Sequence, residues 1–138
     1  MAINFPVKPG TVLICDYSMG FRVPEMVKRR PVVVISPRLP YRDGLCTVVP
    51  LSTTPPDRVT QYQCRIEPDQ PLPAPFDAPV FWAKADMLAT VCFERLDLFR
   101  LPRAGQPKRR YIKPSLSPED LAKIRACVLC ALGISSIN

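Results

Sequence analysis

The feature that most restricts the fold is an unbroken run of β-branched residues, Val32–Ile35, between Pro31 and Pro37. β-branched side chains favour the pleated backbone of a strand, and the run offers no polar side chain for the exposed face of a helix. It therefore predicts a strand buried on both faces. The preceding segment, residues 18–30, has the composition of a charged loop. Because functional groups are often placed on loops that a rigid element holds, this loop is the first candidate site.

The segments on either side of the buried strand are predicted to be strands as well. Residues 11–17 are rich in β-forming side chains and follow a Pro-Gly turn. The dipeptide Asp43-Gly44 is a strong hairpin signal, so residues 45–51 should return antiparallel to the buried strand. Pro50 cannot donate a backbone hydrogen bond, which predicts a sheet edge or a bulge at the end of this strand. The hydroxyls of residues 52–54 would then be exposed at the strand terminus.

The second half of the chain alternates between strand signals and breakers. Residues 61–66 and 80–86 are predicted to be strands, and alternation would put Lys84 and Asp86 on one face of the second. The prolines of residues 67–79 exclude a ladder or a helix and predict an extended surface excursion. Residues 88–101 are predicted to form a turn followed by a strand near residues 95–101. A basic loop then leads into a short strand, 109–113.

The end of the chain predicts one helix. Ser117 is the N-cap, Pro118 takes the first helical position, and Leu116 with Leu121 would form a hydrophobic staple. Apolar side chains then form one stripe that ends at Gly133, namely Leu121, Ile124, Val128, Ala131 and Leu132. Short antiparallel strands followed by a C-terminal helix indicate a mainly β fold, a small SH3-like barrel. The length of 138 residues and the absence of a linker predict a single domain, residues 1–138.

Composition narrows the partners and the chemistry. The net charge of +7 favours a polyanion, most often nucleic acid, with a membrane surface, an acidic protein segment or a merely basic surface as alternatives. Neither a membrane-spanning run nor a signal peptide is visible, so we expect a cytoplasmic protein. The chain contains no histidine, which excludes a Ser-His-Asp or Cys-His relay. Catalysis would have to use carboxylates, hydroxyls and cations.

The six cysteines do not indicate a disulfide scaffold. Cys15, Cys46, Cys64 and Cys92 each lie in an apolar or alternating run, where a reduced thiol packs as a small hydrophobe. Cys127 and Cys130 form a Cys-x-x-Cys pair late in the predicted helix, but there is no second pair at metal-binding spacing. We therefore expect buried thiols, no metal site and no cofactor.

The order of these motifs resembles the MazF/PemK (Kid) toxins, which are mRNA interferases of type II toxin–antitoxin modules. The resemblance covers about residues 8–134, and its most specific part is Glu25, Arg30-Pro31 and Ser36-Pro37 in that order. It also includes the Val-Pro-x-Ser/Thr-Thr strand end, the Ala-Asp strand end and the capped last helix. The resemblance implies a CcdB/PemK-like fold and a sequence-specific endoribonuclease acting on single-stranded mRNA.

The resemblance also implies roles for individual residues. Arg30 corresponds to the arginine that stabilises the transition state, and Glu25 to the loop carboxylate proposed as acid or base. Ser52, with Thr53 beside it, stands where relatives often carry a catalytic threonine. Asp86 corresponds to the general base of the PemK/Kid branch. Two positions depart from the family: Pro24 replaces a histidine, and Lys84 replaces an arginine, which changes a fork-shaped phosphate contact into a point charge.

The chemistry is consistent with these residue types. Attack of a ribose 2′-oxygen on the adjacent phosphate needs a proton acceptor, for which Glu25 and Asp86 are both candidates, and a cation beside the phosphorane, for which Arg30 is the candidate. A metal is not required. Substrate contacts are expected from bases stacking on Phe21, Tyr17 or Trp82 and from phosphates beside the cations Lys28, Arg29, Arg103 and Arg109.

Alternatives remain for both the residues and the function. Glu25 with Lys28 or Arg29, and Asp86 with Lys84, could be solvated ion pairs, the hydroxyls ordinary turn groups, and Phe21 and Trp82 core residues. The whole chain could be a gyrase-poisoning toxin like CcdB, or a non-catalytic SH3-like nucleic-acid or peptide module. The family resemblance also implies a homodimer and a cognate antitoxin whose acidic, disordered tail folds on binding.

Overall fold

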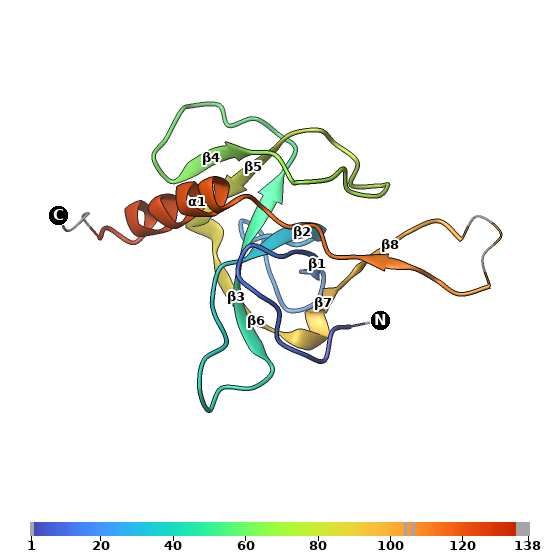
Figure 1. Ribbon diagram of the computed structural model, residues 1–138. Coiled ribbons are helices and arrows are strands. Elements are labelled where there is room, and N and C mark those ends of the chain that lie inside the picture. The colour runs from blue at the N-terminus through green and yellow to red at the C-terminus, as the bar shows by residue number, and fades with distance from the viewer. Residues whose placement is uncertain (1, 104, 106, 135–138) are drawn as a thin grey trace.

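The computed structural model describes residues 2–103, 105 and 107–134. The strands are β1 Val12–Asp16, β2 Arg29–Val34, β3 Leu45–Ser52, β4 Gln63–Ile66, β5 Phe81–Lys84, β6 Ala89–Cys92, β7 Leu96–Asp97, β8 Phe99–Arg100 and β9 Tyr111–Ile112. Two short 3-10 helices, η1 Ala85–Met87 and η2 Phe93–Arg95, lie between strands, and α1 Pro118–Ala131 ends the fold (Figure 1).

Within this part of the chain, seven strands form one antiparallel sheet. Its order is β4-β5-β3-β2-β1-β7, and β6 pairs with β3 beside this path. Strands β8 and β9 form a separate two-stranded ribbon that leads into the orange arm projecting from the body in Figure 1. The mainly antiparallel β architecture with one C-terminal helix confirms the predicted fold class. The strand path itself runs from β4 to β7 without these two strands pairing.

Strand β2 is buried on both faces, as the run of β-branched residues predicts. Val32, Val33 and Val34 are all fully buried, and alternate residues enter different cores. The helix-side core contains Val12, Ile14, Val33, Val49, Leu51, Ile66, Leu72, Phe81, Ala83, Ala85, Phe99, Leu116, Ile124 and Cys127. The loop-side core contains Ile3, Leu13, Cys15, Tyr17, Met26, Val32, Val34, Val48, Val91 and Leu96. The strand begins at Arg29, earlier than predicted, which places Arg30 inside the sheet.

Strand β3 is central, and the prediction of a sheet edge at Pro50 is wrong. Pro50 is buried and pairs with Val32 of β2. On its other side β3 pairs with β6 up to Val48 and with β5 from Leu51 onward. The missing N–H of Pro50 therefore falls where β3 changes partners, which is the position in a central strand that tolerates proline. This change of partners also buries the end of the strand, so Ser52 is 3% exposed instead of solvated.

Two further predictions between residues 80 and 101 are corrected. Strand β5 ends at Lys84 and the chain turns into η1, so Asp86 does not share a strand face with Lys84. The segment expected to begin with a turn contains β6, which pairs with β3 from Leu45 to Val48. The sequence of Ala89–Cys92 shows little alternation of polar and apolar residues, since only Val91 of this edge strand is buried.

The C-terminal helix begins as predicted. The Ser117 hydroxyl accepts a hydrogen bond from the Asp120 N–H at 3.1 Å, and Pro118 is the first helical residue. The buried side chains are Ile124 and Cys127, whereas Leu132 is 56% exposed, so the predicted apolar stripe is wrong at its C-terminal end. Helix α1 contacts β4 and η1 and covers only part of the sheet (Figure 1).

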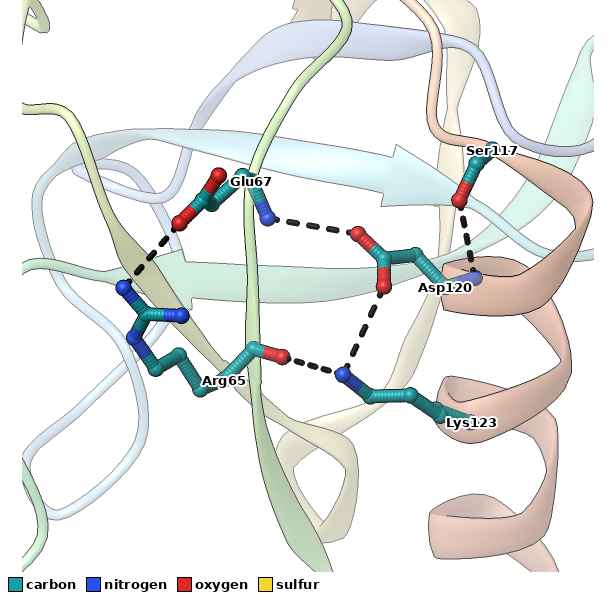
Figure 2. A network of polar contacts seen from close by, with 5 residues as sticks. All are labelled: Arg65, Glu67, Ser117, Asp120 and Lys123. Atoms are coloured by element: carbon teal, nitrogen blue, oxygen red, sulfur yellow. Dashed lines mark hydrogen bonds and ion pairs between the residues drawn. The ribbon is translucent and has the colours of Figure 1, made fainter.

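A polar network fastens the first turns of α1 to β4 (Figure 2). The Asp120 carboxylate accepts the Glu67 N–H at 3.2 Å and pairs with Lys123 at 3.4 Å. Lys123 also donates to the Arg65 carbonyl at 2.8 Å, and Arg65 pairs with Glu67 at 3.0 Å. The helix is thereby held at a defined position along the strand by contacts that the hydrophobic pattern does not specify.

All six cysteines are free thiols, but of Cys15, Cys46, Cys64 and Cys92, which were predicted to be buried, only Cys15 is buried. Cys15 and Cys127 are buried, three others are half-buried, and Cys130 is exposed. Burial raises the pKa of Cys15 from 9.0 to about 12, and that of Cys64 likewise to about 12. These two thiols therefore remain protonated at neutral pH.

Candidate active site

The loop between β1 and β2, residues 17–28, is held by its own side chains. The Ser18 N–H and hydroxyl both donate to the Asp16 carboxylate, and these hydrogen bonds hold the pKa of Asp16 below its ordinary value. Further along, the Glu25 N–H donates to the Arg22 carbonyl at 2.7 Å, and the Arg22 N–H donates to Glu25 Oε1 at 2.7 Å. Glu25 thus closes a turn through its backbone and its carboxylate while it remains exposed.

Arg95 of η2 links this loop to the body of the protein. Its Nη1 donates to the Asp16 carbonyl at 3.0 Å, and its guanidinium carbon lies 4.8 Å from the centre of the Phe21 ring. Phe21 in turn meets the Tyr17 ring edge-on, with centroids 5.0 Å apart. Phe21 is half-buried between these two partners. Its role as an anchor of the loop was not predicted from the sequence.

A cavity of about 310 Å³ lies between this loop and the segment that begins at η1. It brings together the two candidate carboxylates, Glu25 and Asp86, although they are far apart in the sequence. Its lining is otherwise largely apolar and consists of Tyr17, Phe21, Pro24, Met26, Met87, Leu88 and Ala89. The cavity therefore combines proton acceptors with surfaces that can hold the flat face of an organic ring.

Arg30 lies within the sheet and is not among the residues that line this cavity. It pairs with Cys15 across the β1–β2 ladder, and alternation places it on the same face as Val32, Cys15 and Tyr17. The side chain is half-buried, and its Nε is buried without a hydrogen-bond partner. Burial raises the pKa of Tyr17, while the positive charge of Arg30 acts in the opposite direction, so the two groups are close enough to interact. Tyr17 thus connects Arg30 to the cavity.

Only some of the predicted hydroxyl and cationic site residues lie near Arg30. The Ser52 hydroxyl is buried and accepts the Thr54 N–H at 3.1 Å. On the β5 side, Ser52 pairs with Trp82. On the β2 side, Val32 pairs with Pro50, and continuing this register by two residues puts Ser52 across from Arg30. Thr53 is exposed. Of the predicted residues on β3 and β5, Ser52 is therefore the one nearest in the ladder to Arg30.

Three predicted cations lie elsewhere. Lys84 lines a separate cavity of about 420 Å³ with residues from the loop after β3, among them Thr54, Arg58 and Tyr62. Arg29 projects to the helix-side face, opposite Arg30, where it lines a cavity with Ile14 and Phe99. Lys28 is exposed on the loop. The ion pairs of Glu25 with Lys28 or Arg29, and of Asp86 with Lys84, are not found among the described residues.

The described residues contain no group of three or more His, Cys, Asp or Glu side chains arranged to hold a metal ion. Nor does any helix within them have the length and apolar character needed to span a bilayer. The cavity itself offers two carboxylates; the Tyr17 hydroxyl is buried, and Arg30 interacts with Tyr17 from outside the lining. These groups can accept a proton and stabilise negative charge.

The fold and this site together define a class of small basic proteins. Their sheet is mainly antiparallel and is followed by one C-terminal helix, and a loop carboxylate shares a cavity with a second carboxylate. The sequence profile of the family described as PemK-like, MazF-like toxin of type II toxin-antitoxin system matches residues 8–131. The chain therefore belongs to this family, which confirms the resemblance seen in the sequence.

Individual proteins and solved structures are also similar to this chain. The chain is 32% identical to the uncharacterized protein YifN of Escherichia coli (strain K12), over an alignment that covers 100% of each chain. Among solved structures, it matches an endoribonuclease from a Mycobacterial species in complex with its cognate antitoxin, with a TM-score of 0.63, 20% identity and coverage of 96% and 100%. It also matches MazF from Deinococcus radiodurans, with a TM-score of 0.57, 17% identity and coverage of 94% and 99%. At these identities the structural matches concern the fold.

Proposed function

We propose that this protein is a toxin endoribonuclease that cleaves single-stranded RNA. The observation that carries the proposal is the cavity shared by Glu25 and Asp86, with Arg30 behind it. Membership of a toxin family supports it, and so do the matched folds of proteins described as endoribonucleases. The cavity has enough apolar surface to hold a base while the carboxylates face the ribose.

The reaction we propose is attack of a ribose 2′-oxygen on the adjacent phosphorus. Glu25 or Asp86 accepts the 2′-hydroxyl proton, which is typically worth about 10²–10⁴ in rate. The P–O5′ bond then breaks and the departing 5′-oxygen takes a proton from water or from the carboxyl group that received the 2′-hydroxyl proton, which leaves a 2′,3′-cyclic phosphate on one product and a 5′-hydroxyl on the other. Arg30 places its charge beside the phosphorane.

The test is incubation of the purified protein with synthetic single-stranded RNA in the presence of EDTA, followed by mapping of the product ends. We expect cleavage at a defined sequence, with cyclic phosphate termini. Arg30→Ala should lower kcat/KM by about 10²–10³, because it removes a preorganised charge from the transition state. The matched control is Arg38→Ala, which removes an exposed arginine near the opposite end of the same hairpin. Equal activity of the two variants would remove Arg30 from the mechanism.

Separate variants identify the proton acceptor. Glu25→Gln keeps an oxygen that can accept the Arg22 N–H, so the turn is retained while the base is lost. Asp86→Asn is its counterpart across the cavity. The variant with the larger loss of kcat, and without the acidic limb of the pH–rate profile, marks the base. Thr53, Lys84 and Trp82 are proposed as further contacts to the phosphates and the flanking bases, whereas the buried Ser52 hydroxyl makes no contact with the substrate in this arrangement.

The physiological setting follows from the same proposal. We propose a cytoplasmic homodimer that a cognate antitoxin with an acidic, disordered tail inhibits. Light scattering on the purified protein tests the dimer, and co-expression with a neighbouring small acidic reading frame tests the antitoxin.

Two other activities are distinguished by these experiments. A gyrase-poisoning toxin would leave RNA intact and would trap DNA cleavage complexes in a gyrase assay. A non-catalytic module would bind RNA without cleaving it, and Arg30→Ala would then change affinity alone.

A further inference from the structure

Thiols from β4 and α1 meet where the helix packs against the strand. Cys127 of α1 belongs to the helix-side core, and the half-buried Cys64 of β4 packs against that core. A hydrogen bond joins the Cys64 and Cys127 thiols. Cys130, one turn further along α1, is exposed, and its thiol donates to Gln61 Oε1 at 3.7 Å. These sulfur atoms form a series from the surface to the core, here called the thiol cluster (Cys64, Cys127 and Cys130).

Contacts on both sides of the Cys64–Cys127 pair hold this arrangement. On one side, Lys123 of α1 donates to the Arg65 carbonyl at 2.8 Å, next to Cys64 in β4 (Figure 2). Lys123 and Cys127 are four residues apart on the helix, so their side chains lie on the same face. On the other side lies the contact of the exposed thiol with Gln61. The two flanking contacts thus fix the strand against the helix at the position where Cys64 faces Cys127.

The members of the thiol cluster differ in access and in protonation. Burial raises the pKa of Cys64 to about 12 and also raises the pKa of Cys127, while the hydrogen bond from Cys64 acts on Cys127 in the opposite direction. The thiolate is the nucleophile in thiol–disulfide exchange, so the buried pair reacts slowly with an oxidant in solution. The exposed Cys130 is the thiol that such an oxidant reaches first.

We propose that the thiol cluster is an oxidation site, in which Cys130 reacts with a low-molecular-weight disulfide and passes the oxidation to a Cys64–Cys127 disulfide. First, the Cys130 thiolate attacks one sulfur of the small disulfide, and the other sulfur leaves and is protonated to a small thiol. Cys127 then loses its proton to water, attacks Cys130 Sγ and expels the second small thiol. Finally Cys64 loses its proton and attacks Cys127 Sγ, and the departing Cys130 sulfur takes up a proton. The sum converts two protein thiols and one small disulfide into one protein disulfide and two small thiols.

The resulting bridge would join β4 to α1 covalently. Because the two sulfur atoms are already in hydrogen-bond contact, the bridge requires only a small closing movement. A bridge between positions far apart in the sequence restricts the unfolded chain and so stabilises the folded one. In a reducing compartment such a bridge is transient and reports oxidation. The inference goes beyond RNA cleavage and does not depend on it.

The test incubates the native, full-length protein with oxidised glutathione at mildly alkaline pH, blocks the remaining thiols with N-ethylmaleimide, and maps tryptic peptides by mass spectrometry. Trypsin places Cys64 in the peptide 59–65 and both helix thiols in the peptide 126–138. We expect these two peptides to become linked through Cys127, with the maleimide on Cys130. In urea, the oxidised protein should have an unfolding equilibrium constant about a hundredfold smaller than that of the reduced protein.

Single variants separate the entry thiol from the final pair. Cys130→Ser should slow formation of the link on the order of tenfold and leave the final bridge the same. Cys64→Ala should abolish both the link and the gain in stability. The matched control is Cys92→Ser, which removes a half-buried thiol of β6 and should be oxidised like the wild type.

The inference is overturned if all thiols of the native protein stay free, if the final bridge lies within the peptide 126–138, or if linking requires urea. Equal rates for Cys130→Ser and Cys92→Ser would equally contradict entry at Cys130. A link that leaves the urea midpoint unchanged would show that the bridge does not restrain α1 against β4.

Discussion

Arg95 connects the candidate catalytic loop to the rest of the molecule. It contacts the loop at the Asp16 carbonyl and at the Phe21 ring, and the planar guanidinium makes both contacts at once, whereas the single ammonium of a lysine would have to divide between them. Gly20 makes room for this arrangement: its φ is +88°, and an added Cβ would lie 3.2 Å from Arg95 Nη2. Position 20 thus favours glycine because of its positive φ, and a larger residue would also require the Arg95 side chain to shift by a few tenths of an ångström.

Arg95→Ala should release the loop that carries Glu25. We expect a loss of stability of about 1 kcal/mol from the hydrogen bond and the ring contact. We also expect kcat on RNA to fall about tenfold with little change in KM, because the base is displaced while other contacts to the substrate persist. Cleavage kinetics and urea denaturation measure the two effects.

Arg95→Lys keeps the charge and should restore less than half of the lost kcat, whereas Arg125→Ala, an exposed arginine on α1, serves as the control for charge alone. Full activity of Arg95→Ala would mean that the loop holds its conformation through the Glu25 turn by itself.

The buried Cys15 thiol makes a prediction about alkaline pH. Its pKa is raised from 9.0 to about 12 by burial, so the folded state keeps this proton after the unfolded chain has lost it. The contribution to stability is fully present below about pH 9 and is lost as the pH rises toward about 12. The free energy of unfolding should therefore decline over this range, and less steeply in Cys15→Ala. Parallel declines in the two proteins would show that other groups titrate instead.

At the scale of elements, α1 is positioned by polar contacts as much as by its short apolar face. Only Ile124 and Cys127 are buried, while Asp120 and Lys123 both reach the backbone of the β4 region (Figure 2). Two adjacent acidic residues in the first turn, Glu119 and Asp120, have the same favourable interaction with the helix dipole. They therefore allow the docking contacts to be separated from the dipole effect.

Asp120→Ala should destabilise the protein by about 1 kcal/mol more than Glu119→Ala, because only Asp120 accepts the Glu67 N–H and pairs with Lys123. Urea denaturation of both variants measures the difference. Equal losses would mean that the dipole interaction accounts for both residues and that the contact to β4 adds nothing.

At the scale of the whole molecule, the net charge of +7 should govern association with RNA. The logarithm of the binding constant should fall linearly with the logarithm of the salt concentration, with a slope of about −0.7 for each neutralised phosphate of a single strand. Arg30→Ala should reduce the magnitude of the slope by about one contact, and Arg38→Ala should leave it nearly unchanged. Filter binding with uncleavable 2′-deoxy substrate provides the measurement.

Much of the fold could be predicted because its signals are local. The β-branched run of Val32–Ile35 and the cap at Ser117 depend only on neighbouring residues, and the structure confirms the strand and the helix start. The prediction of a sheet edge at Pro50 was wrong because a central strand can accept a proline where its neighbouring strand changes, and the sequence does not reveal which strands flank β3. The short strand β6 was not predicted because only one of its four residues is buried, so its sequence does not alternate between polar and apolar side chains.

The candidate site, like the fold, could be predicted only in part from the sequence. The amino-acid sequence alone specifies which groups are present: the carboxylates, the cations, the absence of histidine and a charged loop next to a stiff strand. The folded arrangement was needed to establish that Glu25 and Asp86 share a cavity, that Arg29 and Arg30 serve opposite faces, and that Arg95 holds the loop. Strand register and sheet order bring together residues distant along the chain, and no local periodicity encodes those distances.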